Sequence, residues 1–180
     1  MKYIAFLRGI NVGGNNIIKM AELKKICEKI GLKNITTYIQ SGNVLFESEG
    51  KNTEIITKKL EDTLSKAFNY TSFVIIKTHS QYKEIIKNIP IEWKDHSELR
   101  CYVAFIKDSV TENDVLKQIE LKEGIDFVKK GPGAIYMTTL LSGLTKSKFS
   151  KLISKKIFQQ MTIRNFNTTQ KILTLFTTLP

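Results

Sequence analysis

The 180-residue chain has few cysteines and no long apolar segment. Two cysteines, Cys27 and Cys101, are too few for a disulfide framework, and no Cys/His spacing indicates a metal site. No apolar run approaches the roughly 18 residues that a membrane-spanning helix needs. Arg8 interrupts the N-terminal apolar stretch and no small-residue cleavage site follows, so we interpret this stretch as a strand rather than a signal peptide. We therefore expect a cytoplasmic protein without membrane contact, metal or other cofactor.

Acidic residues are absent from the last part of the chain. The last one is Asp126, and the nine charged residues that follow are all basic. The first 126 residues carry a net charge of only +2 out of the total of +11. A field of one sign favours anionic partners such as nucleic acid or phosphorylated ligands. A bias toward lysine explains the many lysines but not the missing acids. In a chain biased toward lysine, the three arginines, Arg8, Arg100 and Arg164, are candidate positions where the planar guanidinium group is needed for a two-pronged contact.

Recognisable enzyme signatures are also missing. His79 and His96 have no carboxylate or nucleophile at a recognisable spacing, and the local order Asp95-His96-Ser97 is not a catalytic triad, which is assembled in space. The loop at 8–14 lacks the Gly-Lys-Ser/Thr of a P-loop and the glycine spacing of the dinucleotide fingerprint. Whether the chain is an enzyme stays open.

Hydrophobic periodicity predicts an α+β protein. The first half has the order β-α-β-β-α-β, the ferredoxin-like split β-α-β signature, with strands at 2–10, 35–39, 44–47 and 72–78 and helices at 20–30 and 52–68. A short helix at 81–88 belongs to a connector. The second half is predicted to contain strands at 100–106, 126–130 and 134–139 and helices at 111–121, 147–158 and 167–176. Asn167 and Gln170 fit a capping box for the last helix.

The two halves resemble copies of one unit. Residues 3–8 align with 102–107, and 38–46 align with 127–136 with one extra turn residue, so that Val44 matches Ala134. The alternative to a duplication is that two unrelated pairs of alternating apolar strands around a glycine turn resemble each other by convergence. We predict a ferredoxin-like subdomain at 1–79, a connector at 80–99 and a second α+β subdomain at 100–180. The second subdomain is interpreted as a duplicated β-α-β-β-α unit with an extra C-terminal helix and with basic C-terminal helices.

Two loops of the first half are predicted to be neighbours. In a right-handed split β-α-β unit the first two strands run parallel, so the loop at 11–16 and the hairpin at 40–43 emerge at the same end of the sheet, where 69–72 also arrives. Backbone amides and hydroxyls there suit a polar or phosphorylated group, although turns need such residues for positive φ in any case. The candidate ligand-binding residues are Arg8, Asn11, Gly13, Gly14, Asn15, Gln40, Ser41 and Asn43.

A second candidate site lies in the basic C-terminal third. A helix at 147–158 would carry Phe149, Leu152, Ile153 and Ile157 on one face and lysines on another. Such a lysine face is either the solvated side of a packed helix or a stripe that follows phosphates. The candidate anion- or nucleic-acid-binding residues are Lys148, Lys151, Lys155, Arg164 and Asn165.

Three segments, RGINVGG at 8–14, YIQSGNV at 38–44 and TIRNFNT at 162–168, resemble the bacterial family catalogued as domain of unknown function 1697. The first two agree closely, and the family more often has Trp at the position of Phe166. The resemblance extends over nearly the whole chain. It implies a ferredoxin-like half and a second α+β part, and it implies no activity.

Three functions stay open from the sequence. The first is an anion-binding module for nucleic acid or another polyanion that uses the basic C-terminal third, although the paired sheet aromatics of common RNA-binding domains are missing. The second is an enzyme or sensor for a small phosphorylated or carboxylated ligand at the rim formed by Arg8 and Ser41. The third is a structural protein that forms oligomers, and the sequence does not predict an oligomeric state.

Overall fold

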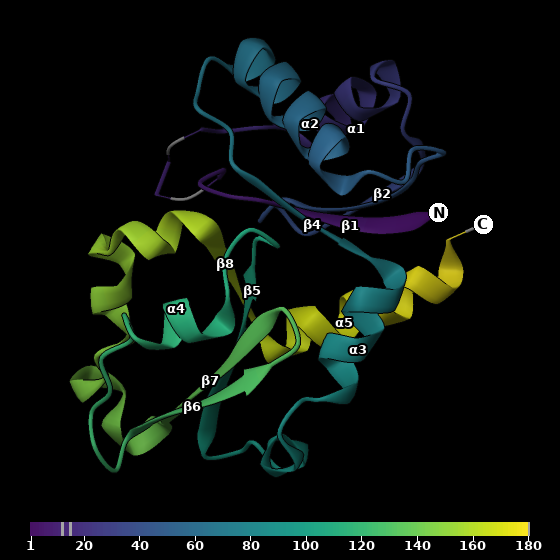
Figure 1. Ribbon diagram of the computed structural model, residues 1–180. Helices are drawn as coiled ribbons and strands as arrows, with labels where there is room; N and C mark the ends of the chain where they lie inside the picture. The colour runs from purple at the N-terminus through teal and green to yellow at the C-terminus, as the bar shows by residue number, and fades with distance from the viewer. Residues whose placement is uncertain (12, 15, 180) are drawn as a thin grey trace. The chain divides into compact units, whose positions relative to one another are not determined.

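The computed structural model describes residues 1–11, 13–14 and 16–179, and these residues form an α+β fold with two four-stranded antiparallel sheets (Figure 1). The chain divides into two units: the first contains the residues up to Tyr82 together with those from Ile172 onward, and the second contains Lys83–Lys171. The subdomain boundaries at 79 and 100 stay a prediction. Among the described residues, no helix has the length and apolar character needed to cross a bilayer.

The first unit has the β-α-β-β-α-β order predicted from its sequence. Its elements are β1 (Lys2–Leu7), α1 (Met20–Lys29), β2 (Lys33–Tyr38), β3 (Asn43–Glu47), α2 (Thr53–Phe68) and β4 (Val74–Thr78), followed by α3 (His79–Lys87). The strand order is β2-β3-β1-β4 with antiparallel neighbours, so β1 and β2 run parallel. Both α1 and α2 lie on one face of this sheet, where Leu23 and Leu60 pack with Ala5 and Val44 (Figure 1).

Asparagines set both ends of α2. The side chain of Asn52 accepts hydrogen bonds from the N–H groups of Glu54 and Ile55 at 2.9 and 3.2 Å. Asn69 ends the helix in the left-handed conformation with φ of 52°, which asparagine tolerates better than most residues. The capped helix therefore delivers the chain to the start of β4.

Aromatic residues cover the opposite face of the first sheet. The ring of Phe6 lies 6.3 Å from that of Tyr82, and Tyr82 lies 5.5 Å from Phe176 near the end of α5 (Phe166–Thr178). His79 stacks on Phe176 at 4.5 Å, and Lys2 Nζ donates to the carbonyl of Leu179 at 2.7 Å. The C-terminal residues are thus part of the core of the first unit.

The second unit repeats the strand order of the first. Its strands are β5 (Leu99–Ile106), β6 (Asp126–Gly131), β7 (Ala134–Leu140) and β8 (Met161–Asn165), arranged as β6-β7-β5-β8 with antiparallel neighbours. A short helix, α4 (Glu112–Leu116), follows β5, and 3₁₀ segments occupy Ile91–Lys94, Leu141–Lys146, Phe149–Ser154 and Lys156–Gln160. One sheet face packs Val115 and Leu152 against Ala104, Ile135 and Met137.

Three predictions for the second unit are wrong. The helix expected at 111–121 ends at Leu116, because the next turn closes with tighter bonds from Gln118 N–H to Val115 O and from Ile119 N–H to Leu116 O. The helix expected at 147–158 is two 3₁₀ segments separated by Lys155, whose ψ of 143° is extended. Ile153, expected on the apolar face, is exposed. The third error is the omission of β8, so the unit is not β-α-β-β-α.

Equivalent backbone hydrogen bonds close both sheets. The last residues of β1 and β5 each donate to a turn glycine, and the residues that follow them donate to the segments before β4 and β8. The bonds are Leu7 N–H to Gly42 O (2.8 Å) and Ile106 N–H to Gly133 O (3.2 Å), then Arg8 N–H to Phe73 O (3.0 Å) and Lys107 N–H to Gln160 O (2.9 Å). These matched pairs support the duplication that the sequence predicts.

The strand register corrects the alignment of the two hairpins. Ala5 pairs with Val44 in the first sheet, and its equivalent Ala104 pairs with Ile135 in the second. Val44 therefore corresponds to Ile135, one residue beyond the Ala134 that the sequence alignment matched to it. A one-residue slip would exchange the two sheet faces, so the register identifies the equivalent core residues.

Asp126 ties the start of β6 to the chain after β7. Its buried carboxylate accepts four hydrogen bonds at 2.7–3.0 Å, which come from Ser147 Oγ, Thr139 Oγ1 and the backbone N–H groups of Lys148 and Lys122. Burial alone would raise the pKa of this carboxyl, but the four donors outweigh burial and hold the pKa below its ordinary value. The last acidic residue of the chain is therefore a structural anchor.

Replacing Gly42 by alanine should destabilise the first unit strongly. A Cβ at Gly42 would lie 2.7 Å from Leu7 Cβ and 2.8 Å from Ile10 Cδ1, and the φ of 74° is unfavourable for alanine. We expect a loss of about 2–5 kcal/mol in the free energy of unfolding, measured with urea. Gly31→Ala is the matched control, because Gly31 has φ of 89° but nothing within 4 Å, and it should lose only about 1–2 kcal/mol. Equal losses would contradict the packing argument.

Asp126→Asn should lower stability by about 2–4 kcal/mol near neutral pH, because an amide offers N–H groups where two donors need an acceptor. The pKa of Asp126 is lowered in the folded state, so the carboxylate stabilises above its unfolded pKa of about 3.9 and loses this effect as pH falls through the folded value. The difference between wild type and variant should therefore shrink below about pH 4. Urea unfolding across pH measures it, with Asp62→Asn as the control, whose exposed pair with Lys58 is worth about 0–1 kcal/mol. A pH-independent difference would contradict this role.

Candidate functional site

The loop after β1 and the hairpin after β2 lie together, which confirms the prediction drawn from the parallel strands. Asn11 Nδ2 donates to the carbonyl of Gln40 at 2.8 Å, and Gly42 of the hairpin is in close contact with Leu7 and Ile10. The segment before β4 reaches the same end, since Arg8 N–H donates to Phe73 O. The predicted rim is therefore a real juxtaposition of three chain segments, whereas its role in ligand binding stays a proposal.

Asparagine side chains at this rim make bonds that shape the loops. Asn11 has φ of 52°, and its side chain donates to and accepts from the backbone of Ile18 at 3.1 and 2.8 Å in addition to its contact with Gln40. Asn43 is fully buried and donates to Tyr38 O at 3.0 Å and Ser41 Oγ at 2.9 Å. These two amides are occupied by the protein itself.

The remaining rim residues differ in exposure. Gly13 and Gly14 are exposed and left-handed, with φ of 58° and 79°. Arg8 is half-buried with its guanidinium carbon 6.0 Å from the centre of the Phe73 ring, and burial lowers its pKa from the ordinary value. Asn15 lies outside the described residues.

Lys148, Lys151 and Lys155, which we call the basic stripe, are partly neutralised by an acidic residue from earlier in the chain. Glu120 forms ion pairs with Lys151 at 3.0 Å and with Lys155 at 3.2 Å, and these lysines lower the pKa of its carboxyl. Lys148 donates its backbone N–H to Asp126. The two units also have similar net charges, +5 for the first and +6 for the second, so the acid-free segment does not produce an acid-free unit.

Arg164 and Asn165 make local bonds at the end of β8. Arg164 Nη1 donates to Thr162 Oγ1 at 2.8 Å and to Ile163 O at 3.0 Å. Asn165 Oδ1 accepts from Thr168 N–H at 2.7 Å and thus caps α5. The capping box predicted from Asn167 and Gln170 is therefore wrong, because the helix begins one residue earlier, at Phe166.

A polar cavity of about 260 Å³ lies beside this cap, within the second unit. It brings together a histidine, an arginine and two asparagines from segments far apart in the sequence. Its lining residues are His96, Leu99, Arg100, Cys101, Leu141, Asn165, Phe166 and Asn167. We refer to it below as the His96 cavity.

The imidazole of His96 is held on two sides. Its Nδ1 lies 3.1 Å from the carbonyl of Trp93, and its ring meets the ring of Phe166 edge-on at 5.2 Å. A carbonyl oxygen only accepts, so Nδ1 carries the hydrogen of this bond. The Nε2 atom is then an acceptor in the neutral ring and a donor in the protonated ring.

The cavity has the donors that an anion needs. Arg100 contributes a guanidinium with five N–H groups, and Asn165 and Asn167 contribute side-chain amides. Burial raises the pKa of the Cys101 thiol to about 11, so this thiol is protonated at neutral pH and is not a nucleophile. The cavity thus combines hydrogen-bond donors from Arg100 and two asparagines with the imidazole of His96.

Sequence reasoning missed the His96 cavity except for two hints. Arg100 stood out as one of three arginines, and Asn165 was a candidate for anion binding. His96 and Phe166 carried no spacing signal, because their contact joins the connector after α3 to the start of α5.

The two histidines of the chain provide a direct test of these ring contacts. The ring resonances of His96 should be sensitive to Phe166 and those of His79 to Phe176, since each pair of ring centroids is within 5.2 Å. In proton NMR spectra we expect Phe166→Leu to move the ring resonances of His96 and leave those of His79, and Phe176→Leu to do the reverse. Movement of both histidines in both variants would contradict the two separate contacts.

Comparison with known proteins identifies a family and similar solved structures. Residues 1–136 match the family described as "Protein of unknown function (DUF1697)", so the segment at 162–168 lies outside the matched residues. The structure described as that of "conserved bacterial protein SP0830 from Streptococcus pneumoniae" is 25% identical, with a TM-score of 0.84 over 97% of each chain. A comparison with curated proteins gives no match. With the family match covering most of its length, the chain belongs to the DUF1697 family.

Proposed function

We propose that this protein binds a small anionic ligand, carrying a phosphate or carboxylate group, in the His96 cavity. The observation that carries the proposal is the convergence of Arg100, the oriented His96 and two asparagines on one cavity of about 260 Å³. A bidentate contact from an arginine to an oxyanion is among the strongest hydrogen-bonded pairs in proteins. The first turn of the 13-residue α5 adds the positive end of a helix dipole.

The other two candidate surfaces support an anion less well. At the rim, the amides of Asn11 and Asn43 are already bonded to the protein. On the basic stripe, Lys151 and Lys155 share Glu120. Exposed lysines of this kind remain suited to long-range attraction of polyanions, but their pairing weakens the case for a phosphate-tracking stripe.

Phosphate binding at the cavity should raise the melting temperature and depend on Arg100. We expect thermal unfolding at constant ionic strength to show a saturable rise in Tm with inorganic phosphate over chloride. Arg100→Ala should weaken phosphate binding by about tenfold or more, because it removes a charge-assisted contact. His96→Gln should weaken it less, since one donor is retained.

The control for this measurement is Lys94→Ala, which removes an exposed cation of the same unit that does not line the cavity. An equal phosphate-dependent Tm rise in wild type and Arg100→Ala would refute the assignment to this cavity. A salt-dependent affinity for oligonucleotides that falls in Lys151→Ala and Lys155→Ala but not in Arg100→Ala would favour polyanion binding instead.

A further inference from the structure

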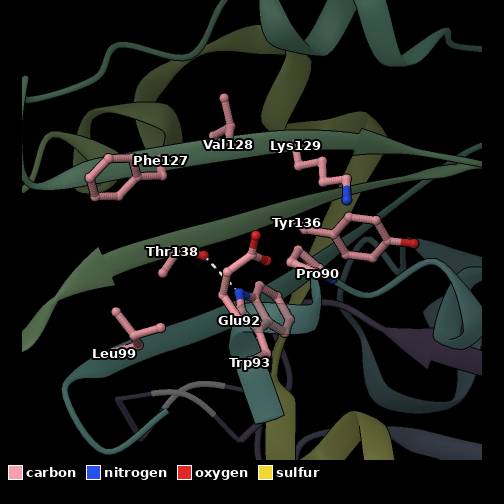
Figure 2. A pocket seen from close by; sticks show the side chains of 9 residues that line it. All are labelled: Pro90, Glu92, Trp93, Leu99, Phe127, Val128, Lys129, Tyr136 and Thr138. Carbon is pink, nitrogen blue, oxygen red and sulfur yellow. Dashed lines mark hydrogen bonds between the residues drawn. The ribbon is translucent and has the colours of Figure 1, made fainter. Parts of the chain in front are cut away.

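A second cavity, of about 300 Å³, adjoins the His96 cavity on the second sheet. Its lining comes from the segment before β5, from the first residue of β5 and from the neighbouring strands β6 and β7 (Figure 2). The lining residues are Pro90, Glu92, Trp93, Leu99, Phe127, Val128, Lys129, Tyr136 and Thr138. We refer to it as the Trp93 cavity.

The floor of the Trp93 cavity is apolar because its polar atoms are already bonded. Trp93 and Tyr136 are each 1% exposed, and their rings meet edge-on at 5.9 Å. The indole Nε1 donates to Thr138 Oγ1 at 2.8 Å (Figure 2), and the Tyr136 hydroxyl donates to Ile85 O at 2.6 Å. Phe127, by contrast, is 49% exposed. A planar ring placed against Phe127 would remove apolar surface from water.

Two charged side chains line the cavity besides these rings. Glu92 contributes a carboxylate and Lys129 an ammonium group, and both residues are exposed. A carboxylate at the edge of an apolar cavity accepts hydrogen bonds from N–H groups and repels an anion. The Trp93 cavity therefore offers an acceptor for N–H groups in Glu92 and a donor in Lys129 beside an apolar floor, which suits the edge and face of a planar heterocycle.

One residue is common to the linings of the two cavities. Leu99 lines both, and Trp93 of one cavity contacts Phe166 of the other with ring centroids 5.3 Å apart. The carbonyl of Trp93 also holds the imidazole of His96. A ligand that spans both cavities would lie against Leu99, with its acidic group toward Arg100 and its planar ring toward Phe127.

We propose that the two cavities are halves of one site for a planar nitrogen heterocycle that carries N–H donors on its edge and is linked to a phosphate or carboxylate, the chemistry of a nucleoside monophosphate. The proposal rests on the proposed function, since it places the anionic group in the His96 cavity. Glu92 accepts from the N–H edge, Phe127 covers one ring face, and Arg100 and His96 bind the anion.

The experiment uses the single tryptophan of the chain as its reporter, because Trp93 lines the heterocycle half. Tryptophan fluorescence of the full chain is titrated with guanosine and adenosine monophosphates, with the free nucleosides, with phenyl phosphate and with inorganic phosphate. We expect at least one nucleotide to bind about tenfold or more tightly than its nucleoside and than inorganic phosphate.

Three variants separate the two halves. Arg100→Ala should weaken the nucleotide about tenfold and leave the nucleoside unchanged, and Glu92→Gln should weaken nucleotide and nucleoside alike while leaving phenyl phosphate unchanged. Glu123→Gln is the control, because it removes an exposed carboxylate of the same unit that lines neither cavity.

The outcomes distinguish this inference from the proposed function. If inorganic phosphate binds through Arg100 but no nucleotide binds more tightly than phosphate, the two-part site is refuted and the proposed function stands. If neither phosphate nor nucleotide binds, both are refuted. Nucleotide affinity that is insensitive to Glu92→Gln would overturn the role of the N–H edge.

Discussion

The indole of Trp93 holds together the part of the second unit from which its candidate chemistry arises. It is 1% exposed, donates to Thr138 on β7, and packs edge-on against Tyr136 and Phe166. Its backbone carbonyl accepts from the imidazole of His96. Trp93 therefore lines one cavity and holds the histidine of the other. A smaller residue here would leave Thr138 without its donor and the Trp93 cavity without part of its lining.

The two units show how one strand arrangement can lead to different surfaces. Both sheets have the same order and equivalent closing hydrogen bonds. In the first unit, Phe6, Tyr82 and Phe176 cover the sheet face that lies away from α1 and α2. In the second, the equivalent face receives Trp93 and Phe166, which pack edge-on and leave cavities beside them. The difference lies in side-chain shape and in the segment before β5, not in the backbone plan.

Local patterns were sufficient to predict most of the first unit. Apolar runs indicated β1, β3 and β4, helical periodicity indicated α2, and the parallel course of β1 and β2 predicted that the loops containing Asn11 and Gln40 are neighbours. β8 was missed because the five residues MTIRN contain only two apolar residues, too short a signal on its own, and they form an edge strand through pairing with β5.

Long-range contacts decided the features that the sequence did not reveal. The segment at 147–158 has apolar spacing that fits a helix, but Ser147 and Lys148 are bound to Asp126, and the chain then forms 3₁₀ turns. The His96 cavity likewise draws its residues from 96–101, 141 and 165–167. No spacing rule connects these positions, because the cavity forms only when the sheet aligns β5 beside β8.

The position of a cation matters more for recognition here than the total charge of +11. Lys151 and Lys155 are solvent-accessible and paired with Glu120, so water and salt screen their fields beyond a Debye length of about 8–10 Å. Arg100 is also exposed, but it lines the His96 cavity together with His96 and two asparagines, so its interaction with an anion there depends on geometry as well as on charge. Under the proposed function, the lysines accelerate the approach of any anion, whereas Arg100, His96 and Glu92 select among anions by the shape and the donor groups of what is attached to them.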